Sequence, residues 1–129
     1  MLNNDVVSSR ALELANIPVI NEDATLKKAL DKMTEFRLGI ALIVDEGNHL
    51  LGVLTDGDLR RLLLTRQNPL PALLVTPALE FGNRSPKFVQ ADLSTEEAKE
   101  IMSREEIWDL PVIDKSGTLI GLVHRHNLN

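Results

Sequence analysis

The 129-residue sequence contains no cysteine. A chain without thiols has no disulfide framework, no cysteine nucleophile and no thiolate ligand for a metal. Aromatic residues are also scarce, with no tyrosine, one tryptophan and three phenylalanines. The chain therefore lacks the aromatic platform on which single-stranded nucleic acids stack, and its core must be built from Leu, Ile, Val and Ala.

The sequence also lacks an excess of positive charge and any long apolar run. Its net charge is −5 and its pI is near 5.1, which argues against a dedicated binder of nucleic acid or of anionic membranes. No run approaches the roughly 18–20 apolar residues of a membrane span. The beginning of the chain lacks the basic and apolar regions of a signal peptide. We expect a cytoplasmic protein with no nucleic-acid or membrane partner.

An internal repeat organises the residues that are present. Adding 69 to a residue number takes Asp45 to Asp114, Gly52 to Gly121 and Leu59 to Leu128. The offset is constant, so the two copies align without a gap. Matches occur at helix, turn and strand positions together. A tandem repeat of this kind implies two similar subdomains related by pseudo-two-fold symmetry.

Each copy shows the pattern strand, helix, strand, strand, with a second helix after the first copy. Apolar residues spaced by three and four predict an amphipathic helix from Leu26 to Phe36, capped by Asp23 or Thr25. Two apolar runs around a short turn predict a β-hairpin in each copy. The expected strands are 17–20, 40–44, 50–54, 87–89, 110–113 and 119–123. A second helix is expected to end near Thr65, and a third is expected to begin at the Ser94 capping box.

The pattern predicts an α+β fold with four parts: an N-terminal extension (1–16), a first repeat (17–65), a linker (66–85) and a second repeat (86–129). The extension has the apolar spacing of a short amphipathic helix, and the linker is rich in proline and polar residues. The second repeat stops where its last helix would begin. We therefore expect the chain to be a fragment of a longer protein.

Two short motifs narrow the family. Gly52, Thr55 and Asp58 form a Gly-x-x-Thr-x-x-Asp motif, and residues 110–114 read Leu-Pro-Val-Ile-Asp. With the repeat, these motifs resemble a CBS domain pair, or Bateman module. The resemblance implies tandem β-α-β-β-α repeats with pseudo-two-fold symmetry, assembly into a homodimer, and regulation of an attached catalytic domain by an adenosine-type nucleotide.

The longer string from Thr55 to Arg61 is similar to CBS pairs of bacterial sugar-nucleotide enzymes. Some of these pairs precede a sugar-phosphate nucleotidyltransferase domain. Others follow a sugar-phosphate isomerase domain of the arabinose 5-phosphate isomerase type. We expect the first arrangement, with the second as the alternative.

The resemblance implies that Thr55 and Asp58 hold the ribose and phosphate of a nucleotide. A carboxylate can accept hydrogen bonds from both ribose hydroxyls, while a Thr hydroxyl and the amides of a helix N-terminus can donate to phosphate. Asp56 lies between these residues, and Arg60, with its neighbour Arg61, could offset phosphate charge. The alternative is that Thr-x-x-Asp is only a helix cap, which needs no ligand.

The second copy departs from this motif, since His124 and Asn127 stand where Thr55 and Asp58 would be. Asn carries no charge, and His could neutralise a phosphate only when protonated. We therefore expect one competent site and one degenerate or differently selective site. The resemblance also implies base contacts, for which core packing is the alternative, at Ile20, Ala41, Leu42 and Leu110.

Together these features predict a non-catalytic regulatory module. It would need no cofactor and would bind an AMP- or ATP-type nucleotide or a nucleotide-sugar. A ligand-free dimerisation scaffold is the alternative. Two further readings are a phosphoryl-transfer site at Asp56 and Asp58 and a metal-binding pair at His124 and His126.

Overall fold

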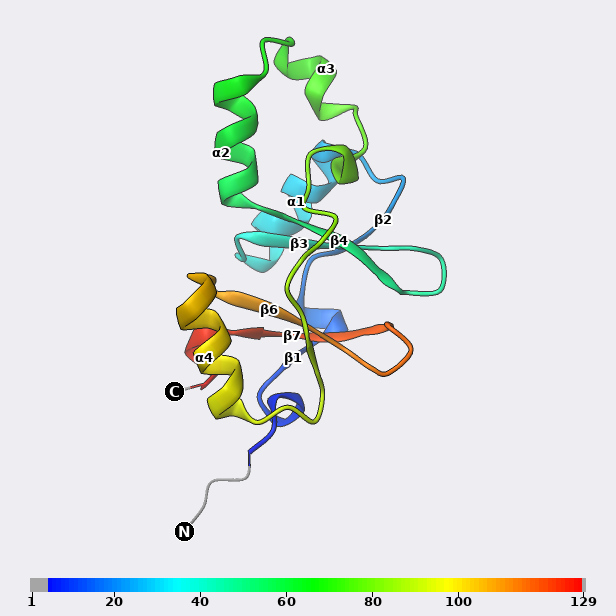
Figure 1. Cartoon of the computed structure of the whole chain (residues 1–129). Helices are drawn as coiled ribbons and strands as arrows, with labels where there is room; N and C mark the ends of the chain where they lie inside the picture. The colour runs from blue at the N-terminus through cyan, green and yellow to red at the C-terminus, as the bar shows by residue number, and fades with distance from the viewer. Residues whose placement is uncertain (1–4, 129) are drawn as a thin grey trace. The chain divides into compact units, whose positions relative to one another are not determined.

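The computed structural model of the chain describes residues 5–128. The chain forms two compact units (Figure 1). One unit contains residues 17–86, and the other joins the segment that ends at Asn16 to the segment that starts at Lys87. No helix among the described residues is both long and apolar enough to cross a bilayer.

The unit of residues 17–86 contains one sheet in the order β2-β3-β4. Strands β2 and β3 are parallel, whereas β3 and β4 form the predicted antiparallel hairpin. The elements in chain order are β2 (Val19–Asn21), α1 (Leu26–Phe36), β3 (Ile40–Val44), β4 (Leu50–Thr55), α2 (Asp56–Thr65), α3 (Leu70–Leu74) and η3 (Ala78–Glu80).

Helix α1 follows from the apolar spacing in the sequence. Its buried residues Leu26, Ala29 and Met33 lie in the same core cluster as Ala41, Ile43 and Leu54 of the sheet. The Thr25 hydroxyl caps the helix by accepting a hydrogen bond from the Lys28 N–H at 3.2 Å. One apolar face of α1 thus covers the sheet and fixes where β3 and β4 run.

The other unit contains the second repeat and one sheet in the order β1-β7-β6-β5. Strands β5 and β6 are parallel, and β6 and β7 form the second predicted hairpin. The elements of this unit are η1 (Val7–Ser9), β1 (Leu12–Glu13), η2 (Leu14–Asn16), β5 (Val89–Gln90), α4 (Thr95–Glu105), β6 (Asp109–Ile113), β7 (Leu119–His124) and η4 (Arg125–Leu128). The resulting mixed α+β architecture is the one predicted.

The segment of residues 5–16 differs from the amphipathic helix that the sequence predicts. Its strand β1 pairs antiparallel with β7, with Leu12 opposite Leu122 and Glu13 opposite Gly121. Val7 is fully buried in the core cluster of this unit. The helix prediction was wrong because the sheet partner of this segment lies at the other end of the sequence and leaves no local signal.

The segment before the second repeat makes the corresponding contact in the other unit. Asn83 forms an isolated bridge with Val53 of β4, with N···O distances of 3.0 and 2.7 Å. Leu73 and Ala78 from α3 and η3 are buried in the core of residues 17–86. The expected linker therefore includes short helices that complete this unit.

Two equivalent glycines permit these contacts. A Cβ atom at Gly52 would lie 2.7 Å from the Asn83 carbonyl oxygen, and one at Gly121 would lie 2.7 Å from the Leu12 carbonyl oxygen. Both obstacles are backbone atoms, which cannot rotate away as a side chain does. Each hairpin thus carries glycine where a segment from outside the hairpin crosses its second strand.

Candidate functional site

Thr55 and Asp58 lie where β4 ends and α2 begins. Thr55 is the N-cap of α2, and its hydroxyl oxygen accepts a hydrogen bond from the Asp58 N–H at 3.2 Å. In return, Asp58 Oδ2 accepts from the Thr55 backbone N–H at 2.9 Å and from the Thr55 hydroxyl at 3.1 Å. The two residues form a complete capping box, so the ligand-independent role predicted for them is present in the structure.

The second oxygen of Asp58 is also in use. Asp58 Oδ1 accepts a hydrogen bond from Nη2 of Arg61, one turn further along α2, and the two residues form an ion pair. The Asp58 side chain is only 13% exposed, whereas that of Arg61 is 63% exposed. The chain's own donors therefore occupy both carboxylate oxygens.

Asp56 and Arg60 lie on the exposed surface of the first turns of α2. The Asp56 N–H donates to the Gly39 carbonyl at 3.1 Å. A Cβ atom at Gly39 would lie 2.6 Å from Asp56 Oδ2, so glycine leaves room for this carboxylate. Asp56 and Arg60, four residues apart, share one face of α2, whereas Asp58 lies on another.

The apolar residues implied in base binding are buried. Ile20 and Ala41 belong to the core cluster of residues 17–86, and Leu110 belongs to the cluster of the other unit. Leu42 is fully buried as well. Their side chains pack as core residues, so a contact with a base would have to use their main-chain atoms. Their part in binding stays a prediction.

The second repeat keeps one of the two reciprocal hydrogen bonds of the capping box. Asn127 Oδ1 accepts a hydrogen bond from the His124 backbone N–H at 3.2 Å, as Asp58 does from Thr55. His124 cannot reproduce the hydroxyl, and its Nδ1 instead lies 2.8 Å from Asp109 Oδ1. The position equivalent to Asp109 in the first repeat is Ile40. The two sites therefore differ in charge and in partners.

Trp108 adds an aromatic cluster to the second site. Its ring centroid lies 6.4 Å from that of His124 and 5.9 Å from that of His126. The two imidazole centroids are 5.0 Å apart. Among residues 5–128, no group of three or more His, Cys, Asp or Glu side chains is arranged to hold a metal ion.

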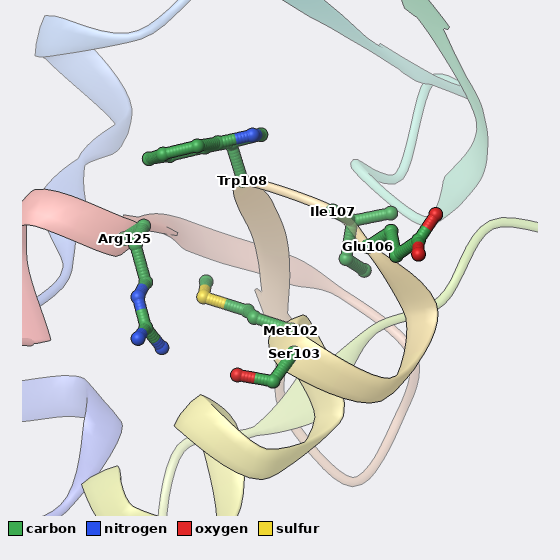
Figure 2. Close-up of a pocket in the computed structure, with 6 residues that line it drawn as sticks. All are labelled: Met102, Ser103, Glu106, Ile107, Trp108 and Arg125. Carbon is green, nitrogen blue, oxygen red and sulfur yellow. The ribbon is translucent and has the colours of Figure 1, made fainter.

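A pocket of about 260 Å³ lies beside this cluster. Figure 2 shows the Trp108 indole on one side and the Arg125 guanidinium and Ser103 hydroxyl on another. Sequence reasoning missed Trp108 and Asp109 as site residues. The available signal was the chain's single tryptophan at the position equivalent to Gly39, directly ahead of the second hairpin. The full lining is Met102, Ser103, Glu106, Ile107, Trp108 and Arg125.

A second hollow, of about 210 Å³, lies next to Asp58. Two arginines line it together with one carboxylate from η3. The Arg66 guanidinium stands 5.6 Å from the centre of the Phe81 ring, a cation–π contact. The hollow is therefore open, strongly polar and continuous with the capping box. Its lining is Asp58, Arg61, Leu62, Thr65, Arg66, Glu80 and Phe81.

Comparison with known proteins gives one family, described as the CBS domain, which matches residues 7–65 and 79–128. A relative from Helicobacter pylori whose function is uncharacterised is 37% identical over 118 residues, which are 91% of this chain and 34% of the relative. The arabinose 5-phosphate isomerase KdsD of Francisella tularensis is 31% identical over 87% of this chain and 33% of its own length. The inosine-5'-monophosphate dehydrogenase of Aquifex aeolicus is 29% identical over 92% of this chain and 23% of its own length.

The chain thus spans about a third or less of the length of these curated relatives. Solved structures agree in fold. The structure of CBSX2 in complex with AMP has a TM-score of 0.83 at 24% identity, covering 95% of this chain and 92% of that one. A CBS domain pair in complex with 5'-methylthioadenosine and S-adenosyl-L-methionine has a TM-score of 0.81 at 17% identity, covering 98% and 94%.

Proposed function

Because the chain belongs to the CBS domain family, we propose that it is a regulatory module that binds an adenosine-type nucleotide through Thr55 and Asp58. Binding would alter the activity of an attached enzyme. The observation that carries the proposal is the partly buried carboxylate of Asp58, which lies at the N-terminal turn of α2 beside an open polar hollow.

The chemistry of this site supports a nucleotide. A carboxylate accepts hydrogen bonds from ribose hydroxyls, and the first turn of a helix with neighbouring arginines favours a phosphate. Two structures with the same fold were solved with adenosine-containing ligands. The second repeat carries His124 and Asn127 at the equivalent positions, so we assign the binding role to the first repeat.

The relatives also bear on the attached enzyme. The two enzymes among those reported above are an isomerase and a dehydrogenase. The expected nucleotidyltransferase gains no support from them. A sugar-phosphate isomerase, the alternative raised by the sequence, is therefore the attached enzyme that we propose.

Thermal unfolding in the presence of nucleotides tests the proposal. We expect AMP, ADP or ATP to stabilise the chain, by about 2.7 kcal/mol at 100 times the dissociation constant. CMP and CMP-sugars, with and without Mg²⁺, serve as comparison ligands. The stabilisation should vanish in Asp58→Ala and persist in Asn127→Ala, each measured against its own ligand-free state.

A ligand-free dimerisation scaffold is the second candidate. It is favoured by the capping box, because both Asp58 oxygens are satisfied without a ligand. Exposed apolar side chains on and near α2, namely Leu63, Leu64, Leu70 and Val75, would supply a surface for association. The absence of any nucleotide-dependent shift, together with a stable dimer in analytical ultracentrifugation, would favour the scaffold.

A further inference from the structure

Three hydrogen bonds within the chain already use the Asp58 carboxylate. A ribose that offers two hydroxyls would meet one oxygen bound to Thr55 and one bound to Arg61. The Thr55 contacts close the first turn of α2, so releasing them would open the helix start. The contact from Arg61 is different, because a long side chain that is 63% exposed can swing away.

The Arg61 guanidinium also covers the first turn of the helix. Its Nη1 and Nη2 atoms lie 3.5 and 3.9 Å from the point where a Cβ atom of Gly57 would be. Thr55 Oγ1 lies 3.6 Å from the same point. A phosphate bound at the amides of this turn would therefore lie close to the Arg61 guanidinium.

The hollow beside Asp58 could accommodate the Arg61 side chain after it leaves the carboxylate. Glu80 of η3 lines this hollow together with Arg61 and Arg66. After release from Asp58, Glu80 or a bound anion in this hollow could compensate the charge of the guanidinium.

We propose that Arg61 is a specificity-determining residue of the Asp58 site, which competes with the ribose in the free protein and pairs with the ligand's phosphate in the complex. This inference rests on the proposed function. A nucleoside that takes over the contact of Arg61 with Asp58 leaves the guanidinium without a counter-charge. A nucleotide supplies a phosphate that replaces the lost carboxylate. The site therefore selects phosphorylated ribosides.

The test compares the affinities of AMP and adenosine by isothermal titration calorimetry. The wild-type chain should bind AMP at least about tenfold more tightly than adenosine. In Arg61→Gln the preference should fall by at least about tenfold, because adenosine binds more tightly and AMP more weakly. Arg104→Gln is the matched control, since Arg104 is also an exposed helical arginine beside a carboxylate, 3.7 Å from Glu105.

The outcomes separate this inference from the proposed function. An unchanged ratio in Arg61→Gln, with AMP still bound by wild type, overturns the role of Arg61 and leaves the regulatory site intact. If wild type binds neither ligand, competition still predicts that Arg61→Gln gains adenosine binding, and such a gain would support it. Binding of neither ligand by either protein overturns both. An unfolding temperature close to that of wild type in each variant would show that any loss of binding is not caused by a loss of folding.

Discussion

Asp58 and Asn127 are equivalent residues that do the same structural work with different charges. Each side chain accepts a hydrogen bond from the backbone N–H three residues earlier, at 2.9 Å for Asp58 and 3.2 Å for Asn127. Closing the first turn requires an acceptor but no negative charge. The charge of Asp58 is therefore left to serve Arg61 and the proposed ligand.

Stability measurements should separate these two duties. We expect Asp58→Ala to lower the free energy of unfolding by about 1 kcal/mol, the usual effect of losing a cap. Asp58→Asn should retain most of that stability, because the amide oxygen still accepts from Thr55. Urea denaturation at pH 7 measures both. Equal losses in the two variants would show that the charge, and not the acceptor, holds the helix start.

The sequence could predict part of this site and not the rest. Thr55 and Asp58 were identifiable because the cap motif and the family motif use the same residues. Arg61 as the partner of Asp58 was not, because the sequence fixes their spacing of three along a helix but not the rotamer. Trp108 and Asp109 were missed because they lie outside the motif and face His124 only after the second hairpin has formed.

At the scale of elements, the two hairpin turns use one device. Asp45 Oδ1 accepts from the Gly47 and His49 N–H groups, both at 2.9 Å. Asp114 Oδ1 accepts from the Ser116 and Thr118 N–H groups at 2.8 and 3.0 Å. A carboxylate after the first strand thus sets the reversal of each hairpin.

This turn gives a pH prediction for the first hairpin. The backbone N–H of His49, with smaller contributions from the His49 side chain and Gly47, holds the pKa of Asp45 below its usual value. A lowered folded-state pKa contributes stability above the unfolded pKa, about 3.9, which is lost as pH falls through the folded value. Asp45→Asn should therefore be less stable than wild type near neutrality, and the difference should shrink below about pH 4.

Chemical denaturation of both proteins between pH 7 and pH 2.5 measures this difference. A constant gap across the range would contradict the role of the Asp45 charge. The change spans the interval between the folded-state and unfolded-state pKa values of Asp45, so its lower end reports the folded-state pKa.

Periodicity predicted the elements whose partners are near in sequence. Helix α1 and both hairpins were visible because their apolar faces repeat within a few residues. Strand β1 and helix α3 were not, because their burial depends on partners outside the local window. Short elements of this kind carry too few residues for a period to show.

At the scale of the whole molecule, the chain consists of two units that do not follow the order of the sequence. The unit that contains the second repeat is completed by Val7 and β1 from the start of the chain. The unit of residues 17–86 is completed by its own continuation through α3, η3 and Asn83. Repeat boundaries in the sequence and unit boundaries in the structure are therefore different.

A substitution near the start of the chain should act on the unit at its end. We expect Val7→Ala to lower stability by about 2 kcal/mol, because Val7 is fully buried. Hydrogen exchange should rise in β7 and α4 and stay unchanged in β3. Leu14→Ala is the control, since Leu14 is 40% exposed in the same segment. Faster exchange in β3 alone would contradict the assignment of Val7.

The pairing of β1 with β7 also dictates an order of events during folding. The residues of β2, β3 and β4 are neighbours along the chain, so their unit has low contact order and can form while synthesis continues. Leu12 meets Leu122 only after a loop that spans nearly the whole sequence has closed, which is slow and entropically unfavourable. Strand β1 therefore joins the sheet late, after β7 has been made, and the edge of β7 stays unpaired until then.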